Sequence, residues 1–299
     1  MSITYQYRHC KSVSEDLAAF KRGIEAYEKS EVKGPPPWSI DAPRPEIPAD
    51  VDVSHFELNG LTCVKTVSKT NRQKKKAVFY IHGGGMMAGS VEDCLLILPE
   101  ITARSSIDGY SIEYTLVPHA RYPVQIEQCL AMYEWLLCQG YEQIALIGVS
   151  AGANLCLAVT MRCREKGLPL PACVVSMSGV MDSSGTVKPK RPDFLSADVE
   201  GLVTKNYIGE LDPKTPDVSP LFADFNGFPP TLFQVGEAES IQDAHLALME
   251  RLENENIDAE IEFSLWENMG HGFALEGGYY PEGYVGRDQV IDYILARFR

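Results

Sequence analysis

Apolar positions in the first 50 residues follow a helical pattern that then gives way to prolines. Four of them recur at the spacing of one helix face: Leu17, Phe20, Ile24 and Tyr27. Residues 1–35 show no strand patterning, so we expect one or two amphipathic helices there. Prolines after Gly34 stop the helix and keep the chain extended to about residue 50. Residues 1–50 are therefore predicted to form N-terminal cap helices and a connector.

From residue 51 onward, short β-rich runs alternate with helical stretches. The predicted strands cover residues 51–58, 61–67, 77–81, 110–116, 143–149, 172–178, 231–236 and 259–266. The predicted helices cover residues 92–104, 124–138, 151–166, 196–208, 241–255 and 287–298. Asn59-Gly60 is a strong hairpin signal, and strands that alternate with helices imply parallel strands with right-handed crossovers. We expect an α/β fold in which helices cover both faces of a mostly parallel, eight-stranded sheet.

The chain is long enough for one large α/β domain, since it has 299 residues. Residues 51–299 carry the alternating pattern and are predicted to form that domain, which would hold the active site. Residues 183–229 lie between two predicted strands and are long and proline-rich. We expect them to form a second cap segment, inserted in the domain.

Charge and cysteine content exclude several classes of partner. With 41 acidic and 27 basic residues the formal charge is −14, which argues against nucleic acid and against anionic membrane surfaces. The sequence has no apolar run of bilayer length and no signal-peptide core. The eight cysteines lack CxxC and metal-site spacing, so we expect reduced thiols in a cytoplasmic protein. We predict a small-molecule substrate and expect the protein to need neither a metal nor a cofactor. The sequence leaves open whether the chain forms a homo-oligomer.

The pentapeptide Gly148-Val149-Ser150-Ala151-Gly152 joins a predicted strand directly to a predicted helix. This is the context of a GxSxG nucleophile elbow, in which a tight turn lifts the serine out of the backbone. The helix N-terminus that follows favours developing negative charge. We therefore predict that Ser150 is a nucleophile at the carboxyl edge of the sheet. The alternative is a glycine-rich turn with a capping serine.

His82-Gly83-Gly84-Gly85 follows the strand predicted at 77–81. Acyl transfer needs two or three N–H donors aimed at an oxyanion, and we expect the N–H groups of Gly83, Gly84 and Ala151 to supply them. A competing interpretation is nucleotide binding, because Gly83, Gly85 and Ala88 fit GxGxxA and Asp108 could be the ribose-binding acid. That acid should end a strand, yet Asp108 precedes one, which weakens this interpretation.

A serine nucleophile needs a base, and the base needs an orienting acid. In this chain order the histidine comes last, and of the six histidines two follow Ser150: His245 and His271. His245 lies inside a predicted helix, whereas His271 lies in a glycine-flanked loop after the last strand, so we predict His271 as the base. Position leaves four candidate acids open: Glu237, Glu239, Asp243 and Asp182.

These residues together resemble the hormone-sensitive-lipase-like family of α/β-hydrolase esterases over roughly residues 75–299. The resemblance rests on HGGG at 82–85, GVSAGAN at 148–154 and GHGF at 270–273. It implies an α/β-hydrolase fold with a helical cap made by the N-terminal arm and residues 190–210. It also implies that His82 is structural. The run from Gly236 to Asp243 matches the family's acid motif with Glu239 at the acid position, so we choose Glu239 over Glu237 and Asp182.

The resemblance implies a serine carboxylesterase that forms an acyl-enzyme intermediate. Met86 and Met87, with Tyr27 or Trp38 from the cap, suggest an apolar site for short-to-medium acyl chains. Two alternatives stay open: the same triad acting on an amide, formamide or lactone, and a non-catalytic receptor that reuses the cavity. The sequence departs from the family at Val149, where the usual residue is Asp, and at His119, where it is Glu.

Overall fold

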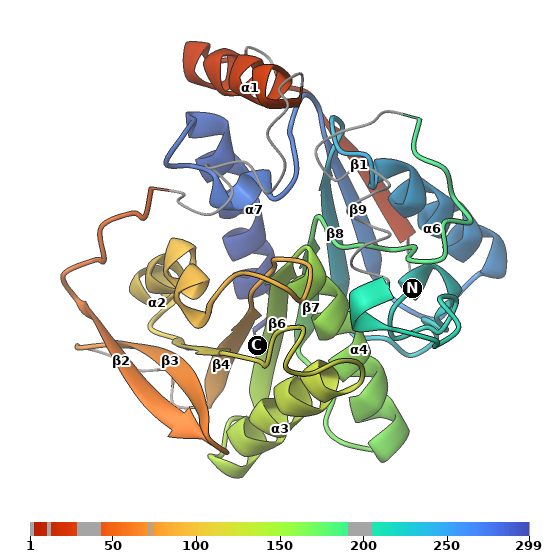
Figure 1. The fold of residues 1–299 in the computed structure, drawn as a ribbon. Helices are drawn as coiled ribbons and strands as arrows, with labels where there is room; N and C mark the ends of the chain where they lie inside the picture. Colours follow the sequence, from red (N-terminus) through yellow and green to blue (C-terminus); the bar gives the residue numbers. More distant parts are fainter. Residues whose placement is uncertain are drawn as a thin grey trace.

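The computed structural model describes residues 3–10, 13–28, 43–70, 73, 75–190 and 205–298. In these ranges, nine strands form one sheet in the order β1-β9-β8-β7-β6-β4-β5-β3-β2 (Figure 1). Their bounds are β1 Ile3–Arg8, β2 Val51–Leu58, β3 Leu61–Ser68, β4 Lys76–Ile81, β5 Asp108–Ile112, β6 Gln143–Val149, β7 Cys173–Met177, β8 Thr231–Gly236 and β9 Ile261–Trp266. The pairs β2–β3 and β3–β5 are antiparallel. All other neighbours are parallel, which confirms the predicted mostly parallel α/β sheet.

Strand β1 contradicts the prediction that residues 1–35 form no strand and raises the strand number from eight to nine. It lies beside β9 in parallel, with Ile3 opposite Ile261 and Arg8 opposite Trp266. Its sequence ITYQYR alternates apolar or aromatic residues with polar ones, as a half-buried strand requires. The pattern is too short to identify a strand alone, so pairing with β9 decides the conformation.

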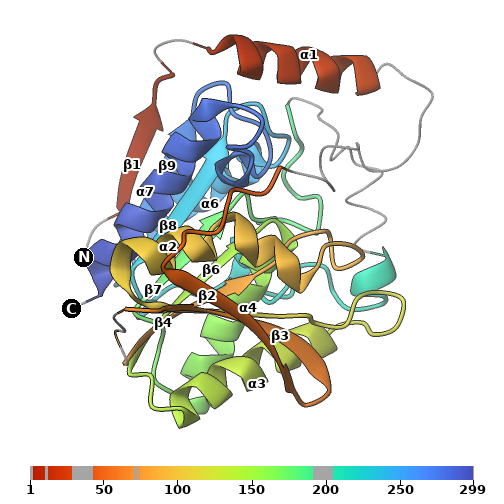
Figure 2. The ribbon, with the colours of Figure 1, turned by 90° about the vertical axis from the view of Figure 1, so that its left-hand side faces the viewer.

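Helices cover both faces of the sheet. Their bounds are α1 Glu15–Glu28, α2 Leu98–Ser105, α3 Val124–Cys138, α4 Ala151–Lys166, α6 Gln242–Glu255 and α7 Pro281–Arg297, and the short 3₁₀ turns are η2 Val91–Leu96, η3 Pro220–Phe222 and η4 Phe273–Leu275. Helices α3, α4 and α6 pack on one face and α2 and α7 on the other, with α1 beside the start of α7 (Figures 1 and 2). Helix α7 begins six residues before the predicted start, because Pro281 suits the first position of a helix.

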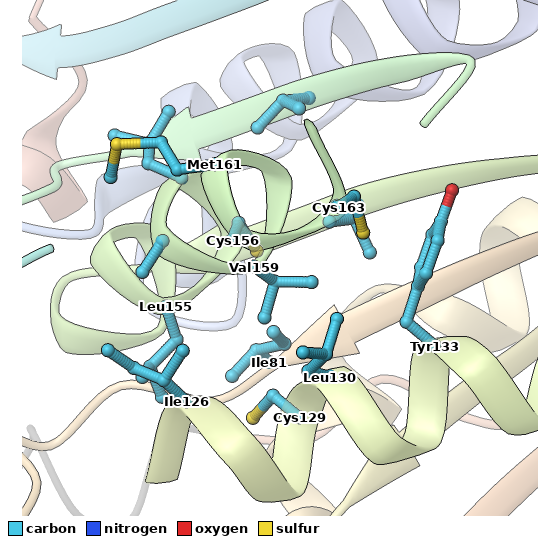
Figure 3. Close-up of a cluster of buried hydrophobic side chains, with 14 of the residues drawn as sticks. Ile81, Ile126, Cys129, Leu130, Tyr133, Leu155, Cys156, Val159, Met161 and Cys163 are labelled. Atoms are coloured by element: carbon cyan, nitrogen blue, oxygen red, sulfur yellow. The ribbon is translucent and has the colours of Figure 1, made fainter. Parts of the chain in front are cut away.

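The core divides into two layers because side chains alternate along each strand. In β4, Phe79 and Ile81 face the α3–α4 layer, whereas Val78 and Tyr80 face the α2–α7 layer. Figure 3 shows the first layer, in which side chains from α3 and α4 meet around Ile81. Both faces of the central strands are buried, which explains why their sequences are continuous apolar runs.

The predicted caps fall largely outside the described residues. These include Trp38, residues 196–204 of the helix predicted at 196–208, and the Tyr27 side chain. The domain boundaries at 1–50, 51–299 and 183–229 therefore stay predictions. Within the described ranges, Val218, Leu221 and Phe225 are buried in the same core as α4 and α6. All eight cysteines are free, and no helix in these ranges is long and apolar enough to cross a membrane.

Candidate active site

Five adjacent parallel strands end at one edge of the sheet, and the predicted site residues follow them. In sheet order these strands are β9, β8, β7, β6 and β4. His271 follows β9, Glu239 follows β8, Ser150 follows β6 and the glycine run from Gly83 follows β4. Because parallel strands end together, the topology brings all of these loops to one place.

Ser150 occupies a strained turn between β6 and α4. Its backbone angles are φ 54° and ψ −121°, and α4 begins at the next residue, Ala151. The turn is close to β4, since a Cβ atom at residue 152 would lie 2.1 Å from the carbonyl oxygen of Ile81. Only glycine fits there. Strain of this kind at a strand–helix junction is typical of a nucleophile elbow.

Glu239 and His271 form a buried hydrogen-bonded pair. His271 Nδ1 donates to Glu239 Oε2 at 2.8 Å, and the two side chains are 10% and 0% exposed. Burial raises the pKa of Glu239, and hydrogen bonds from His271, the Gly236 N–H and Ser178 oppose that rise. The Gly236 N–H and the Ser178 hydroxyl both donate to Oε1, at 2.6 and 2.7 Å. The arrangement fixes the imidazole tautomer that leaves Nε2 available to accept a proton.

The other candidate acids are engaged elsewhere. Asp182 accepts hydrogen bonds from the N–H groups of Ser184 and Val187 at 2.8 and 2.7 Å, and so shapes a turn. Glu237 accepts the N–H of Asn268 at 3.3 Å. Asp243 accepts the N–H of Lys190 at 2.7 Å and faces its ammonium at 3.4 Å. These contacts agree with the choice of Glu239 over the alternatives.

The glycine loop after β4 lies directly against Ser150. A Cβ atom at residue 83 would lie 3.3 Å from Ser150 Cβ and 2.9 Å from the Val149 carbonyl oxygen. His82, before it, is buried and stacks on Tyr114 with ring centroids 4.1 Å apart. Burial lowers the pKa of His82, and the Tyr114 hydroxyl donates to the His82 carbonyl at 3.0 Å. His82 is thus packed against Tyr114 beside the loop, and its structural role stays a prediction.

The nucleotide-binding interpretation does not fit the structure. Asp108 is the first residue of β5 and pairs with Ala77 near the start of β4. It therefore lies at the sheet edge opposite the glycine loop. Its carboxylate accepts the Tyr141 hydroxyl at 2.5 Å in the protein interior, so it is a buried structural acid.

The Val149 side chain lies between two loops, the glycine loop after β4 and the loop that holds His271. A Cβ atom at residue 83 would lie 3.2 Å from its Cγ1, and one at Gly272 would lie 3.4 Å from its Cγ2. The residue before Ser150 thus packs between the glycine loop and the residue after His271. Val149 stands where the family's usual residue is Asp, and nothing in the structure explains this departure. The other departure, His119, is exposed.

Several residues considered from the sequence have other roles. His245 is buried in α6, where its Nδ1 lies 3.0 Å from the Ile241 carbonyl oxygen, and burial lowers its pKa to about 4. Met86 is a core residue and Met87 is half-buried. Across the ranges that the structure describes, no group of three or more His, Cys, Asp or Glu side chains could hold a metal ion.

Ser178 is a site residue that sequence reasoning missed. It follows β7, has a positive φ of 49° and is buried. Its hydroxyl contacts Glu239, and it accepts the N–H of Gly272, next to His271, at 3.0 Å. The one feature of the sequence that could have identified Ser178 is its place at the carboxyl end of a buried strand.

Comparison with known proteins agrees with this geometry. Residues 78–275 match the α/β hydrolase fold family. An esterase from Acinetobacter venetianus strain RAG-1 is 30% identical over 236 residues, which span 76% of this chain and 77% of that protein. An acetyl-hydrolase from Streptomyces hygroscopicus is 28% identical over 228 residues, 74% of this chain and 76% of that protein. A hormone-sensitive lipase from a metagenome library superposes with a TM-score of 0.82 at 25% identity, covering 97% of this chain and 100% of that one.

Proposed function

Because the chain belongs to the α/β-hydrolase fold family and its relatives are esterases, we propose that it is a serine carboxylesterase. Its substrates are carboxylic esters with short-to-medium acyl chains, and its reaction passes through an acyl-enzyme. The observation that carries this proposal is the buried hydrogen bond from His271 to Glu239, in loops that pack against the strained turn at Ser150. It is the base–acid half of a serine triad.

The reaction begins when Ser150 Oγ attacks the ester carbonyl and His271 Nε2 takes its proton. Glu239 holds the imidazole by its Nδ1–H and stabilises the imidazolium that forms. The N–H groups of Gly83, Gly84 and Ala151 receive the oxyanion. His271 returns the proton to the leaving alcohol, and water then cleaves the acyl-enzyme by the same route, which regenerates Ser150.

The preference for short acyl groups is supported by the similarity to an acetyl-hydrolase. Met86 is buried in the core and does not bear on this preference. The second candidate activity is the same triad acting on amides or lactones, because the triad chemistry itself does not distinguish these acyl donors.

The test is hydrolysis of p-nitrophenyl esters of graded chain length, with matched anilides and lactones. We expect the highest kcat/KM for short ester chains and a loss of at least about 1,000-fold in Ser150→Ala. Ser54→Ala, an exposed serine on β2, is the matched control. A fluorophosphonate should label the wild type and Ser54→Ala but not Ser150→Ala. Labelling without hydrolysis of any ester would favour another acyl donor, and no labelling at all would favour a non-catalytic receptor.

A further inference from the structure

We propose that Ser178 is a positioning residue of this esterase, whose hydroxyl orients Glu239 and the backbone after His271 together. The inference rests on the proposed function, since it assigns Glu239 and His271 as acid and base. Ser178 follows β7, the strand between the nucleophile strand β6 and the acid strand β8. It therefore lies where the three catalytic loops meet.

The hydrogen bonds around Ser178 form a closed ring. The Gly272 N–H donates to Ser178 Oγ at 3.0 Å, and the Ser178 hydroxyl donates to Glu239 Oε1 at 2.7 Å. Glu239 Oε2 accepts from His271 Nδ1 at 2.8 Å, and the peptide bond from His271 to Gly272 closes the ring. The same carboxylate therefore fixes the imidazole directly and fixes the backbone behind it through the hydroxyl.

A hydroxyl is the group that suits this position. It must accept from one neighbour and donate to another at the same time, and it must do so while buried, since Ser178 is 1% exposed. Removing it leaves the Gly272 N–H and one lone pair of Glu239 without that partner in a low-dielectric environment. Glu239 would then keep its hydrogen bonds from His271 and Gly236 but lose its second donor at Oε1.

The residue before Ser178 supports the nucleophile. The Ser150 N–H donates to the Met177 carbonyl oxygen at 2.9 Å, and the Ser178 N–H donates to the Gln234 carbonyl oxygen at 2.7 Å. The end of β7 thus holds the nucleophile turn through Met177 and the acid–base pair through Ser178. A shift of Ser178 would change the alignment of Ser150 with His271, and alignment errors of about 1 Å cost on the order of 100-fold in rate.

The Ser178 hydroxyl also affects how readily the Glu239–His271 pair takes up a proton. Among the described residues, the titratable groups that interact with Glu239 and His271 include Glu276 and Tyr280, which follow η4, and His245 in α6. Without the donor from Ser178, the Glu239 carboxylate is less stabilised, so the pair takes up a proton more readily. The acidic limb of the rate profile should then move to higher pH.

The experiment compares Ser178→Ala and Ser178→Gly with Ser176→Ala. Ser176 lies two residues earlier in β7, is fully buried, and has no hydrogen-bond partner for its hydroxyl among the described residues, so its replacement controls for a lost buried hydroxyl. Glycine suits the positive φ of Ser178, so Ser178→Gly removes the hydroxyl without backbone strain. We expect both Ser178 variants to lose about 10- to 100-fold in kcat with KM unchanged, with the acidic limb moved to higher pH.

A second measurement does not depend on activity. The Gly272 amide should exchange slowly with solvent in the wild type and in Ser176→Ala, and faster in both Ser178 variants. A kcat within twofold of wild type in folded Ser178→Ala or Ser178→Gly would overturn the inference, and so would equal losses in Ser176→Ala. If Ser178→Ala fails to fold, Ser178→Gly carries the test. A wild type without hydrolase activity would overturn the proposed function instead, and the Gly272 amide would still test the ring.

Discussion

His271 Nδ1 donates a hydrogen bond to Glu239 Oε2 across 2.8 Å, and the carboxylate that accepts it is fully buried. A buried carboxylate is stable there because other groups also donate to it. The pair can therefore hold one imidazole tautomer with little freedom.

Replacing the acid should affect activity far more than replacing its neighbours. Glu239→Gln keeps the shape but presents the imidazole with a neutral amide, so we expect kcat to fall by about 100- to 10,000-fold. Glu237→Gln and Asp182→Asn, whose carboxylates serve local backbone contacts, should change kcat less than about threefold. Steady-state kinetics on a p-nitrophenyl ester measures this. Equal losses in all three variants would leave Glu239 without a special role.

Gly83→Ala should damage the site through crowding. Its Cβ would press on the Val149 carbonyl oxygen at 2.9 Å and on Ser150 Cβ at 3.3 Å. Displacing an oxyanion donor costs about 100- to 1,000-fold in kcat. The control is Gly23→Ala in α1, where a Cβ meets no atom within 4 Å, and which should stabilise that helix by about 0.5–1 kcal/mol. Full activity in Gly83→Ala would contradict its place beside the oxyanion.

His245 should make the protein less stable in acid. Burial lowers its pKa to about 4 in the folded state, whereas the unfolded value is roughly 6.5. As the pH falls below that unfolded value, the unfolded chain takes up a proton that the folded chain refuses, so stability is lost until the pH reaches the folded pKa. The loss is about 3 kcal/mol for this residue.

Urea unfolding at neutral pH and near pH ~4.5 tests the effect. In His245→Leu the difference between the two free energies of unfolding should shrink by most of that amount, while esterase activity at neutral pH should persist. A wild-type-like acid dependence would show that folding does not lower the pKa of His245. A folded but inactive variant would point to His245, rather than His271, as the base.

Helix α1 should depend on one carboxylate for its attachment. Glu282, at the start of α7, accepts the Ser14 N–H at 2.7 Å and the Ser14 hydroxyl at 2.8 Å. Phe20 packs on the rings of Tyr279 and Tyr280, 5.2 and 5.1 Å away. In Glu282→Ala we expect local opening of α1 to become easier by about 1–2 kcal/mol.

Hydrogen exchange of the α1 amides measures this opening, and the rates should rise about 5- to 30-fold while α4 stays protected. Glu250→Ala, at an exposed position in α6, is the control and should leave α1 unchanged. If α1 exchanges at the wild-type rate in Glu282→Ala, the apolar contacts of Leu17 and Phe20 hold the helix without this carboxylate.

The strands and helices at the centre of the sheet could be predicted from the sequence. Their residues are buried on both faces, so their apolar patterns are clear. Strands β6 and β8 and helix α4 have the predicted bounds. The strands are short, mostly apolar runs, and α4 begins after the turn at Ser150 and ends at Gly167. Strand β1 could not be predicted because its partner lies more than 250 residues away in the chain. Helix α7 extends beyond its apolar pattern because its first turns are set by Pro281.

The site residues also differ in how well the sequence predicts them. Ser150 and His271 follow from local motifs, whereas the carboxylates near β8 share one short loop and pattern alone leaves them equivalent. In the structure these carboxylates differ, because the Gly236 N–H donates to Glu239. From the sequence, only the family resemblance could select Glu239 among them. Ser178 has no local motif, since its contacts come from loops far along the chain.

The pairing of β1 with β9 has a consequence for biosynthesis. Strand β1, residues 3–8, leaves the ribosome long before its partner β9, residues 261–266. The amino-terminal segment must therefore wait, unpaired, while most of the polypeptide is translated. A nascent chain stalled before residue 261 would carry this segment as an unpaired strand, accessible to chaperones and to neighbouring nascent chains.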